Sequence, residues 1–274
     1  MAVWINGTLV PDDEARISVF DHGLVTGDGV FKTVKVARGV PFALSRHLAR
    51  LGRSAAGLGL AEPDLEQIRA GVLAVIEASG QPELARMRIT VTGGIAPLGS
   101  ERGDSPLTAI VALGEMRAPA PWVDVTIVPW PRNEHGALSG LKTTSYGENV
   151  RALAYAASRG GGEAIFPNTA GNLCEGTGTN VFVVSGGQLL TPPLSAGCLA
   201  GVTRALVIEW SGAAEQDLPL AALAEADEAF LTGTTRDVQP IRSVDAQVLA
   251  AAPGPITRKA SEVFAMRAAE TPDP

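Results

Sequence analysis

One lysine of this chain has surroundings unlike those of a surface lysine. Lys142 lies in the uncharged segment GALSGLKTTSYG, and lysine is scarce elsewhere in the chain. Removing an amine from water favours its neutral form, and a neutral lysine can form a Schiff base with a carbonyl compound. The sequence therefore makes Lys142 a candidate for covalent chemistry, with a solvated loop lysine as the alternative.

A carboxylate at the edge of an apolar strand is the second candidate. Glu175 lies in LCEGTGTNVFVV. Carboxylates are seldom buried unpaired in such places, so Glu175 could hold a proton on a buried ring nitrogen. The alternative is a turn glutamate that faces solvent. Tyr146, four residues after Lys142, could donate a hydrogen bond to a cofactor oxygen or could be an ordinary core tyrosine.

Two segments have the composition of an anion site. Residues 201–204 (GVTR) open a predicted helix, where free N–H groups and the helix dipole attract anions. Residues 232–235 (TGTT) follow a predicted strand and offer hydroxyls and amides. A buried phosphate also needs a cation, and Arg50 on the first long helix could supply it, unless that arginine is solvated.

The elements that must position these residues are mixed in type. Strands and hairpins with inserted helices precede a proline-rich segment (RAPAPW), and an alternation of strands and helices follows it. We expect an α/β protein of the α+β type with two domains. The expected N-terminal domain covers residues 1–116, the linker 117–122, and the C-terminal domain 123–274. Within them we expect a hairpin turn at Asn6-Gly7 and a helix capped by Ser45.

Composition excludes several functions. The formal net charge of −7 argues against nucleic acid and anionic membranes as main partners. We find no secretory signal, no apolar run of bilayer length, no phosphate-binding P-loop and no His/Cys metal pattern, so we expect no metal and a cytoplasmic location. Two cysteines give no disulfide framework. His22 is expected in a loop role, and His47 at the surface or in a structural role.

The order and spacing of these motifs resemble the class IV aminotransferases, which are pyridoxal-5′-phosphate (PLP) enzymes of fold type IV. This group includes D-amino acid aminotransferases, branched-chain aminotransferases and aminodeoxychorismate lyases. The resemblance runs from Trp4 to the strand and turn at 229–241. Its most specific parts are EGTGTNVF from Glu175, LTPP from Leu190 and LAGVTR from Leu199.

The resemblance implies a role for each candidate. Lys142 resembles the lysine that forms the Schiff base, Glu175 the partner of the pyridine nitrogen, and Arg50 the phosphate-binding arginine. The other cofactor contacts that it implies are Leu199 on the ring face, Val202, Thr203, Thr234 and Thr235 at the phosphate, and Tyr146 near the phenolic oxygen, as in the branched-chain enzymes. It also implies PLP in a cleft between two domains, and a homodimer whose partner chain closes the site.

The substrate is less well indicated. The segment DGVFKTVKV looks closest to D-amino acid aminotransferases, which makes Phe31 and Lys35 candidate substrate-binding residues. Many relatives have glutamate where this chain has Lys32. The arginine and histidine that bind the substrate carboxylate in D-amino acid enzymes fall at Leu98 and Ser100, so that trap is missing.

Arg236 could replace the missing trap, because it follows the TGTT turn and could bind a carboxylate as a bidentate fork. An exposed arginine or an ion pair with Asp237 is the alternative. Arg88 and Arg102 are weaker candidates for the same role.

The sequence therefore predicts a transaminase that moves an amino group between a D-amino acid, or an R-amine, and an α-keto acid. The alternatives are an aminodeoxychorismate lyase that releases pyruvate and 4-aminobenzoate, a branched-chain L-amino acid aminotransferase, and a PLP carrier without turnover.

Overall fold

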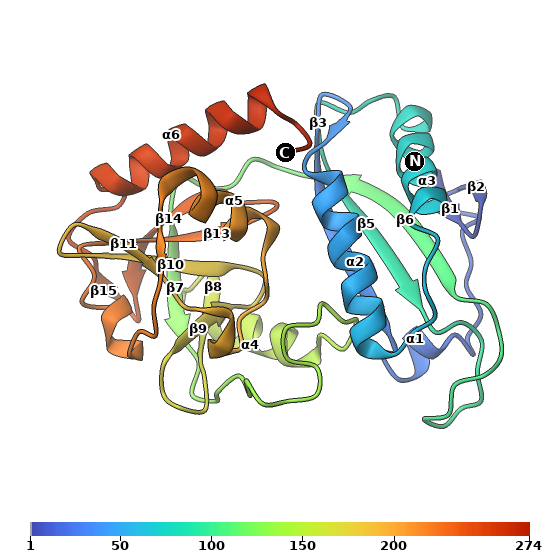
Figure 1. The fold of residues 1–274 in the computed structure, drawn as a ribbon, viewed down its shortest axis with the longest axis horizontal. Coiled ribbons are helices and arrows are strands. Elements are labelled where there is room, and N and C mark those ends of the chain that lie inside the picture. Colours follow the sequence, from blue (N-terminus) through green and yellow to red (C-terminus); the bar gives the residue numbers. More distant parts are fainter. Residues whose placement is uncertain (1) are drawn as a thin grey trace. The chain divides into compact units, whose positions relative to one another are not determined.

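The computed structural model describes residues 2–274, which form two compact units (Figure 1). The first unit contains the chain up to Arg117 together with Leu141–Tyr146 and Thr271–Pro274. The second contains Ala118–Gly140 and Gly147–Glu270. The two short segments in the first unit differ from the prediction, which gave all of 123–274 to one domain. Both are held in the first unit by backbone hydrogen bonds across long sequence separations, which composition does not reveal.

The first unit is an antiparallel sheet covered by two helices. The strand order is β2-β1-β6-β5-β3-β4. Alternate residues of the strands, such as Val34 and Met87, pack against Leu51 of one helix and Val72 of the other in a single core. The elements are β1 (Ala2–Ile5), β2 (Thr8–Pro11), α1 (His22–Val25), β3 (Gly29–Ala37), β4 (Val40–Pro41), α2 (Leu44–Leu58), α3 (Leu65–Ala78), β5 (Leu84–Thr92) and β6 (Thr108–Glu115).

The turn between β1 and β2 confirms the hairpin prediction. Asn6 and Gly7 have φ angles of 48° and 95°, the left-handed pair that a tight hairpin of this twist requires.

Helix α2 begins without a side-chain cap of its own. Its N-cap residue is Ala43, in the left-handed region with φ 53°, so the prediction of Ser45 as the cap is wrong. The end of the chain provides the missing acceptors. Ala43 N–H donates to Pro272 O at 2.7 Å, and Ser45 N–H donates to Asp273 Oδ1 at 2.8 Å. The first turn of α2 is therefore satisfied by residues more than two hundred positions away.

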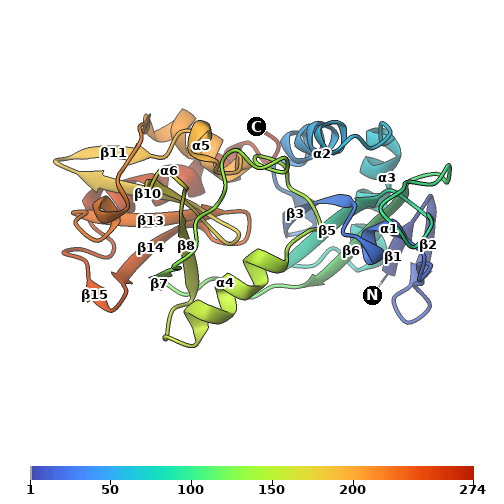
Figure 2. The same ribbon diagram turned by 90° about the horizontal axis from the view of Figure 1, so that it is seen from below.

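The second unit is a nine-stranded mixed sheet with helices on both faces (Figure 2). Strand β7 pairs in parallel with β8 and β14, whereas most other pairs are antiparallel. Helix α4 packs against β8, and α5 and α6 pack together near β13. The elements are β7 (Val123–Ile127), α4 (Gly147–Ala157), β8 (Glu163–Pro167), β9 (Leu173–Gly176), β10 (Asn180–Ser185), β11 (Gln188–Thr191), η1 (Leu194–Ala196), α5 (Val202–Ser211), β12 (Ala214–Glu215), η2 (Leu220–Leu223), β13 (Glu228–Gly233), β14 (Asp237–Val244), β15 (Gln247–Val248) and α6 (Pro255–Glu270).

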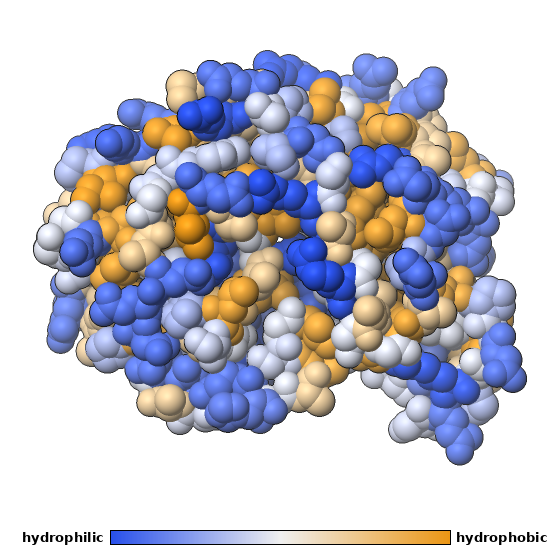
Figure 3. Space-filling model, viewed as in Figure 1, coloured by the Kyte–Doolittle hydropathy of each residue, from blue (hydrophilic) through white to orange (hydrophobic). Residues whose placement is uncertain are grey.

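The face of the molecule in Figure 3 carries both hydrophilic and hydrophobic residues. Figure 3 shows hydrophilic residues over most of the displayed face, with hydrophobic residues scattered among them. No helix within residues 2–274 combines the length and apolar character needed to cross a bilayer. Both cysteines, Cys174 and Cys198, are buried and free.

Candidate active site

Lys142 is held against the start of β3 by backbone pairing. Phe31 N–H donates to Lys142 O at 3.0 Å, and Thr144 N–H donates to Gly29 O at 2.8 Å. The lysine side chain is 8% exposed, and its Nζ donates to Tyr146 Oη at 3.1 Å. The alternative of a loop lysine with its head in water is therefore wrong. The structure joins Lys142 and Tyr146 directly, a contact that the sequence analysis did not predict.

Aromatic rings form the immediate surroundings of this amine. Lys142 Nζ lies 4.6 Å from the centroid of the Phe31 ring. The Phe31 and Tyr146 rings meet edge to face, with centroids 5.0 Å apart. The guanidinium of Arg88, on β5, stacks on the same Phe31 ring at 3.7 Å. Arg88 and Lys142 thus share a contact with Phe31, although the sequence ranked Arg88 below Arg236.

Further basic side chains are buried between β3 and α2. Arg50 is 6% exposed, so the alternative of a solvated arginine is wrong, and His47 and Lys32 are also buried. Lys32 Nζ donates to Ser54 Oγ at 2.9 Å. Burial, with the nearby charges of Arg50, Lys142 and Arg53, lowers the pKa of Lys32 to about 5. This cluster suits an anion, since negative charge would relieve the crowding of basic groups.

In the second unit, Glu175 is anchored by a backbone amide. Its Oε2 accepts from Leu199 N–H at 2.8 Å, and its Oε1 lies 3.5 Å from Arg132 Nε. Arg132 also bonds Glu148, and its guanidinium stacks 4.1 Å from the Phe166 ring. The solvent-facing alternative for Glu175 is wrong, because it is paired. Sequence reasoning missed Arg132, which stands in an irregular segment with no motif to mark it.

The start of α5 offers free backbone donors. Val202 and Thr203 occupy its first turn, and the N-cap residue Gly201 makes no side-chain cap. A Cβ at Gly201 would lie 2.1 Å from Asn180 Oδ1, while Asn180 Nδ2 donates to Leu199 O at 2.8 Å. Only glycine therefore lets the chain enter this helix beside Asn180. The N–H groups of the first turn are left available to an anion.

The TGTT segment forms the turn of the β13–β14 hairpin. Arg236 N–H donates to Gly233 O at 3.0 Å, and Asp237 follows with φ 51°. Thr234 and Thr235 occupy the two central positions and are half-buried. The hydrogen bond from Arg236 to Gly233 closes a β-turn between the two strands. It presents the threonine hydroxyls at the end of the sheet.

Other predicted substrate residues are less favourably placed. Arg236 donates to Gly162 O at 3.2 Å and to Gln239, and it lies 3.5 Å from the buried Glu163, which the sequence analysis missed. Lys35 lies on the Phe31 side of β3, with its Nζ 5.7 Å from the Phe42 ring. Leu98 is 69% exposed, so nothing at that position binds a carboxylate.

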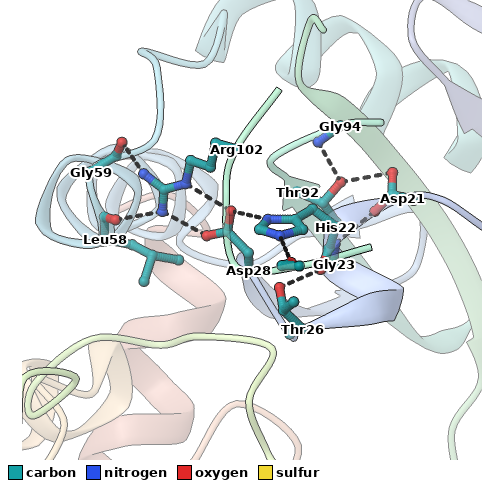
Figure 4. A network of polar contacts seen from close by, with 12 residues as sticks. Asp21, His22, Gly23, Thr26, Asp28, Leu58, Gly59, Thr92, Gly94 and Arg102 are labelled. Carbon is teal, nitrogen blue, oxygen red and sulfur yellow. Dashed lines mark hydrogen bonds and ion pairs between the residues drawn. The ribbon is translucent and has the colours of Figure 1, made fainter. Parts of the chain in front are cut away.

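A buried histidine network braces the loop that contains Leu98 (Figure 4). His22 Nδ1 lies 2.8 Å from Asp28 Oδ2, and its Nε2 lies 3.1 Å from Gly99 O. Both neighbours are acceptors, so both ring nitrogens carry protons. Hydrogen bonding to Asp28, followed by that to Gly99, raises the pKa of His22. Arg102 joins Asp28 at 2.6 Å and also donates to the carbonyls of Leu58 and Gly59 at the end of α2.

Taken unit by unit, these donors fit the cofactor that the motifs implied. A carbonyl needs an amine, which Lys142 provides beside a phenol. In the first unit, Arg50 is a buried cation that suits a phosphate, and in the second unit the first turn of α5 offers backbone donors that suit one. A ring nitrogen needs a fixed carboxylate, which Glu175 provides. Within residues 2–274 there is no group of three or more His, Cys, Asp or Glu residues that could hold a metal ion.

Comparison with known proteins shows the family of this chain. Residues 29–244 match the family model described as Amino-transferase class IV. A putative branched-chain-amino-acid aminotransferase of Methanocaldococcus jannaschii is 34% identical over 96% of this chain and 95% of its own length. The D-alanine aminotransferase of Bacillus licheniformis is 29% identical over 94% of each. The crystal structure of the branched-chain aminotransferase of Thermoproteus uzoniensis with norvaline matches with a TM-score of 0.87 and 31% identity, over 97% of this chain and 93% of that one.

Proposed function

Because this chain belongs to the class IV aminotransferases, whose cofactor is PLP, we propose that it transfers amino groups between aliphatic L-amino acids of the branched-chain type and α-keto acids. The observation that supports this best is the hydrogen bond of 3.1 Å between Lys142 and Tyr146. The motif resemblance relates this tyrosine to the branched-chain enzymes in particular. The sequence alone placed the D-amino acid hypothesis first, and we now propose the branched-chain one ahead of it.

The surroundings of the lysine support an apolar substrate. Phe31 and Tyr146 present aromatic surface beside the reacting amine. The position expected to carry the D-type carboxylate arginine is the exposed Leu98. An aliphatic side chain gains from contact with aromatic surface, since the water removed from both is released. A carboxylate trap at residue 98 plays no part in this arrangement.

In this proposal each residue has one task. PLP, when bound, supplies an electron sink for the α-carbon of the substrate. Lys142 holds the cofactor before the reaction and then moves the proton from the substrate α-carbon. Tyr146 orients the lysine amine, and Glu175 holds a proton on the ring nitrogen. Arg50 binds the phosphate.

The remaining cofactor contacts are assigned to the residues that the motifs predicted: Leu199, Val202, Thr203, Thr234 and Thr235. Fixed positions for the amine and the phosphate shorten the path of the proton.

The substrate carboxylate needs its own partner, and two arginines remain candidates. Arg88 stacks on Phe31, which also contacts Lys142. Arg236 is already engaged by Gly162 and Gln239. We propose Arg88 ahead of Arg236 for this task. Arg88→Leu should raise the KM for amino acids, whereas an unchanged KM would return the assignment to Arg236.

A D-amino acid transaminase is the second candidate. Phe31 and Lys35, which the D-type motif makes candidate substrate residues, lie on one side of β3, and Phe31 is in contact with Lys142. The same site would then take D-alanine or D-glutamate.

We also propose a homodimer, on the motif resemblance alone, and light scattering of the purified protein measures its mass.

The deciding experiment adds single amino acids to the PLP-loaded protein without a keto acid and follows the visible spectrum. Loss of the cofactor band with L-leucine or L-valine supports the proposal. Loss only with D-alanine or D-glutamate supports the second candidate. If no amino acid removes the band, the transaminase proposal fails, and release of pyruvate from aminodeoxychorismate would establish the lyase. Lys142→Ala is the control that should not react with any of them.

A further inference from the structure

Lys32 is more deeply buried than the other basic side chains described near Lys142. Its exposure is 0%. It belongs to the face of β3 that carries Val30 and Val34, and its cross-strand neighbour on β5 is the buried Ile89. Its amine donates to Ser54 Oγ on α2 at 2.9 Å. A charged lysine among the buried valines of a strand costs free energy, so its presence here indicates a function.

Apart from the Ser54 hydroxyl, the polar groups described around this amine are basic. Helix α2 contributes Arg50, Arg53 and His47, and the segment Leu141–Tyr146 contributes Lys142. The β5 side contributes the apolar Ile89. No carboxylate is among the groups that act on Lys32. Burial and these positive neighbours hold its pKa at about 5, so the amine is neutral near pH 7 while the site contains no anion.

A bound phosphate would reverse this balance. Two negative charges close to Arg50 favour the charged form of any nearby amine. Lys32 and Arg50 interact electrostatically, so charge placed at Arg50 is felt at Lys32. Ser54 connects the same amine to the catalytic segment, because its Oγ accepts from Lys142 N–H at 3.4 Å.

We propose that Lys32 is a second cation of the phosphate site at Arg50, and that it takes up one proton from solvent when the phosphate binds. Lys32 is thus a positioning residue, which acts through the phosphate and through Ser54. This inference rests on the assignment of Arg50 to the PLP phosphate in the proposed function, and it is independent of which amino acid is the substrate.

The charge of Lys32 is observed directly by NMR of the full chain labelled with ¹³C at the lysine ε-carbons. The chain has four lysines, so Lys32 is assigned by elimination with Lys35→Met, Lys142→Met and Lys259→Met. At pH 7 the signal should have the neutral-amine shift without ligand. It should move to the ammonium shift with PLP or inorganic phosphate, and it should stay neutral with pyridoxal, which lacks the phosphate.

Two results would overturn the proposal. One is a Lys32 signal that is already ammonium without ligand, or that stays neutral with saturating phosphate. The other is a change with pyridoxal equal to that with PLP. A protein that binds inorganic phosphate and charges Lys32 but does not bind PLP would support this inference and refute the proposed function.

Phosphate affinity gives a second readout. Between the pKa of Lys32 without phosphate, about 5, and its higher pKa with phosphate bound, the dissociation constant of inorganic phosphate should rise with pH more steeply in the wild type than in Lys32→Met, by up to about tenfold per pH unit. His47→Gln is the matched control, since His47 is buried in the same cluster and its pKa is also well below normal. If His47→Gln abolishes the steeper dependence and Lys32→Met retains it, the proton goes to His47 and the proposal is wrong.

Discussion

Replacing Tyr146 by phenylalanine removes the hydroxyl and keeps the ring that packs edge to face on Phe31. The substitution removes the hydrogen bond of 3.1 Å that Lys142 Nζ donates to Tyr146 Oη. A hydrogen bond of this kind contributes about 0.5–1.5 kcal/mol net, which corresponds to about a 2- to 12-fold change in rate. A group that itself transfers the proton contributes about 10²–10⁴-fold. We expect the smaller change in rate, because Lys142 moves the proton and Tyr146 orients the lysine amine.

The assay is single-turnover loss of the cofactor band with the best amino acid substrate. Tyr155→Phe is a matched control, since Tyr155 is the other tyrosine of the chain and packs on Trp130 in the second unit. It should react at the wild-type rate. A Tyr146→Phe rate equal to the wild type would refute the orienting role. A loss of a hundredfold or more would show that the tyrosine takes part in proton transfer.

Three further outcomes are expected. The folded-state pKa of His22 is raised, so the stability difference between wild type and His22→Gln should be largest below about pH 6.5 and should shrink as pH rises. Below about pH 4, protonation of Asp28 should shrink the same difference. Urea titrations at a series of pH values measure both effects. Gly201→Ala places a Cβ 2.1 Å from Asn180 Oδ1, so overpacking of about 1–3 kcal/mol should weaken PLP binding by about 5- to 150-fold in fluorescence titrations; an unchanged affinity would contradict the role of this helix start. Asp273→Ala should cost about 1 kcal/mol and about 2–4 °C in Tm by calorimetry, whereas no change would mean that water replaces the cap.

Local patterns predicted much of this molecule. The Asn6-Gly7 turn and the alternation along β3 follow from backbone preferences and from a period of two, which any window of the sequence displays. The uncharged surroundings of Lys142 correctly indicated a buried amine. The burial of Lys32 could also have been predicted, since it lies on the same face of β3 as Val30 and Val34.

Contacts between residues far apart in the sequence could not be predicted from it. The pairing of Arg132 with Glu175 joins an irregular segment to strand β9, and no periodicity relates the two residues. Ser45 has the chemistry of a helix cap and lies where a cap belongs, yet the helix starts one residue earlier. The acceptor that it meets is Asp273, and only the folded path of the whole chain brings the two together. Propensity yields to tertiary structure at such positions.

The cap on α2 has a consequence for how the protein is made. On the ribosome, the helix that carries Arg50 emerges more than two hundred residues before Pro272 and Asp273. Until they arrive, the first turn of α2 has only water for its amides. The Lys142 segment is also translated well after the sheet that it joins. The first unit therefore completes its folding only after the second has been translated, and no continuous fragment of the gene encodes it.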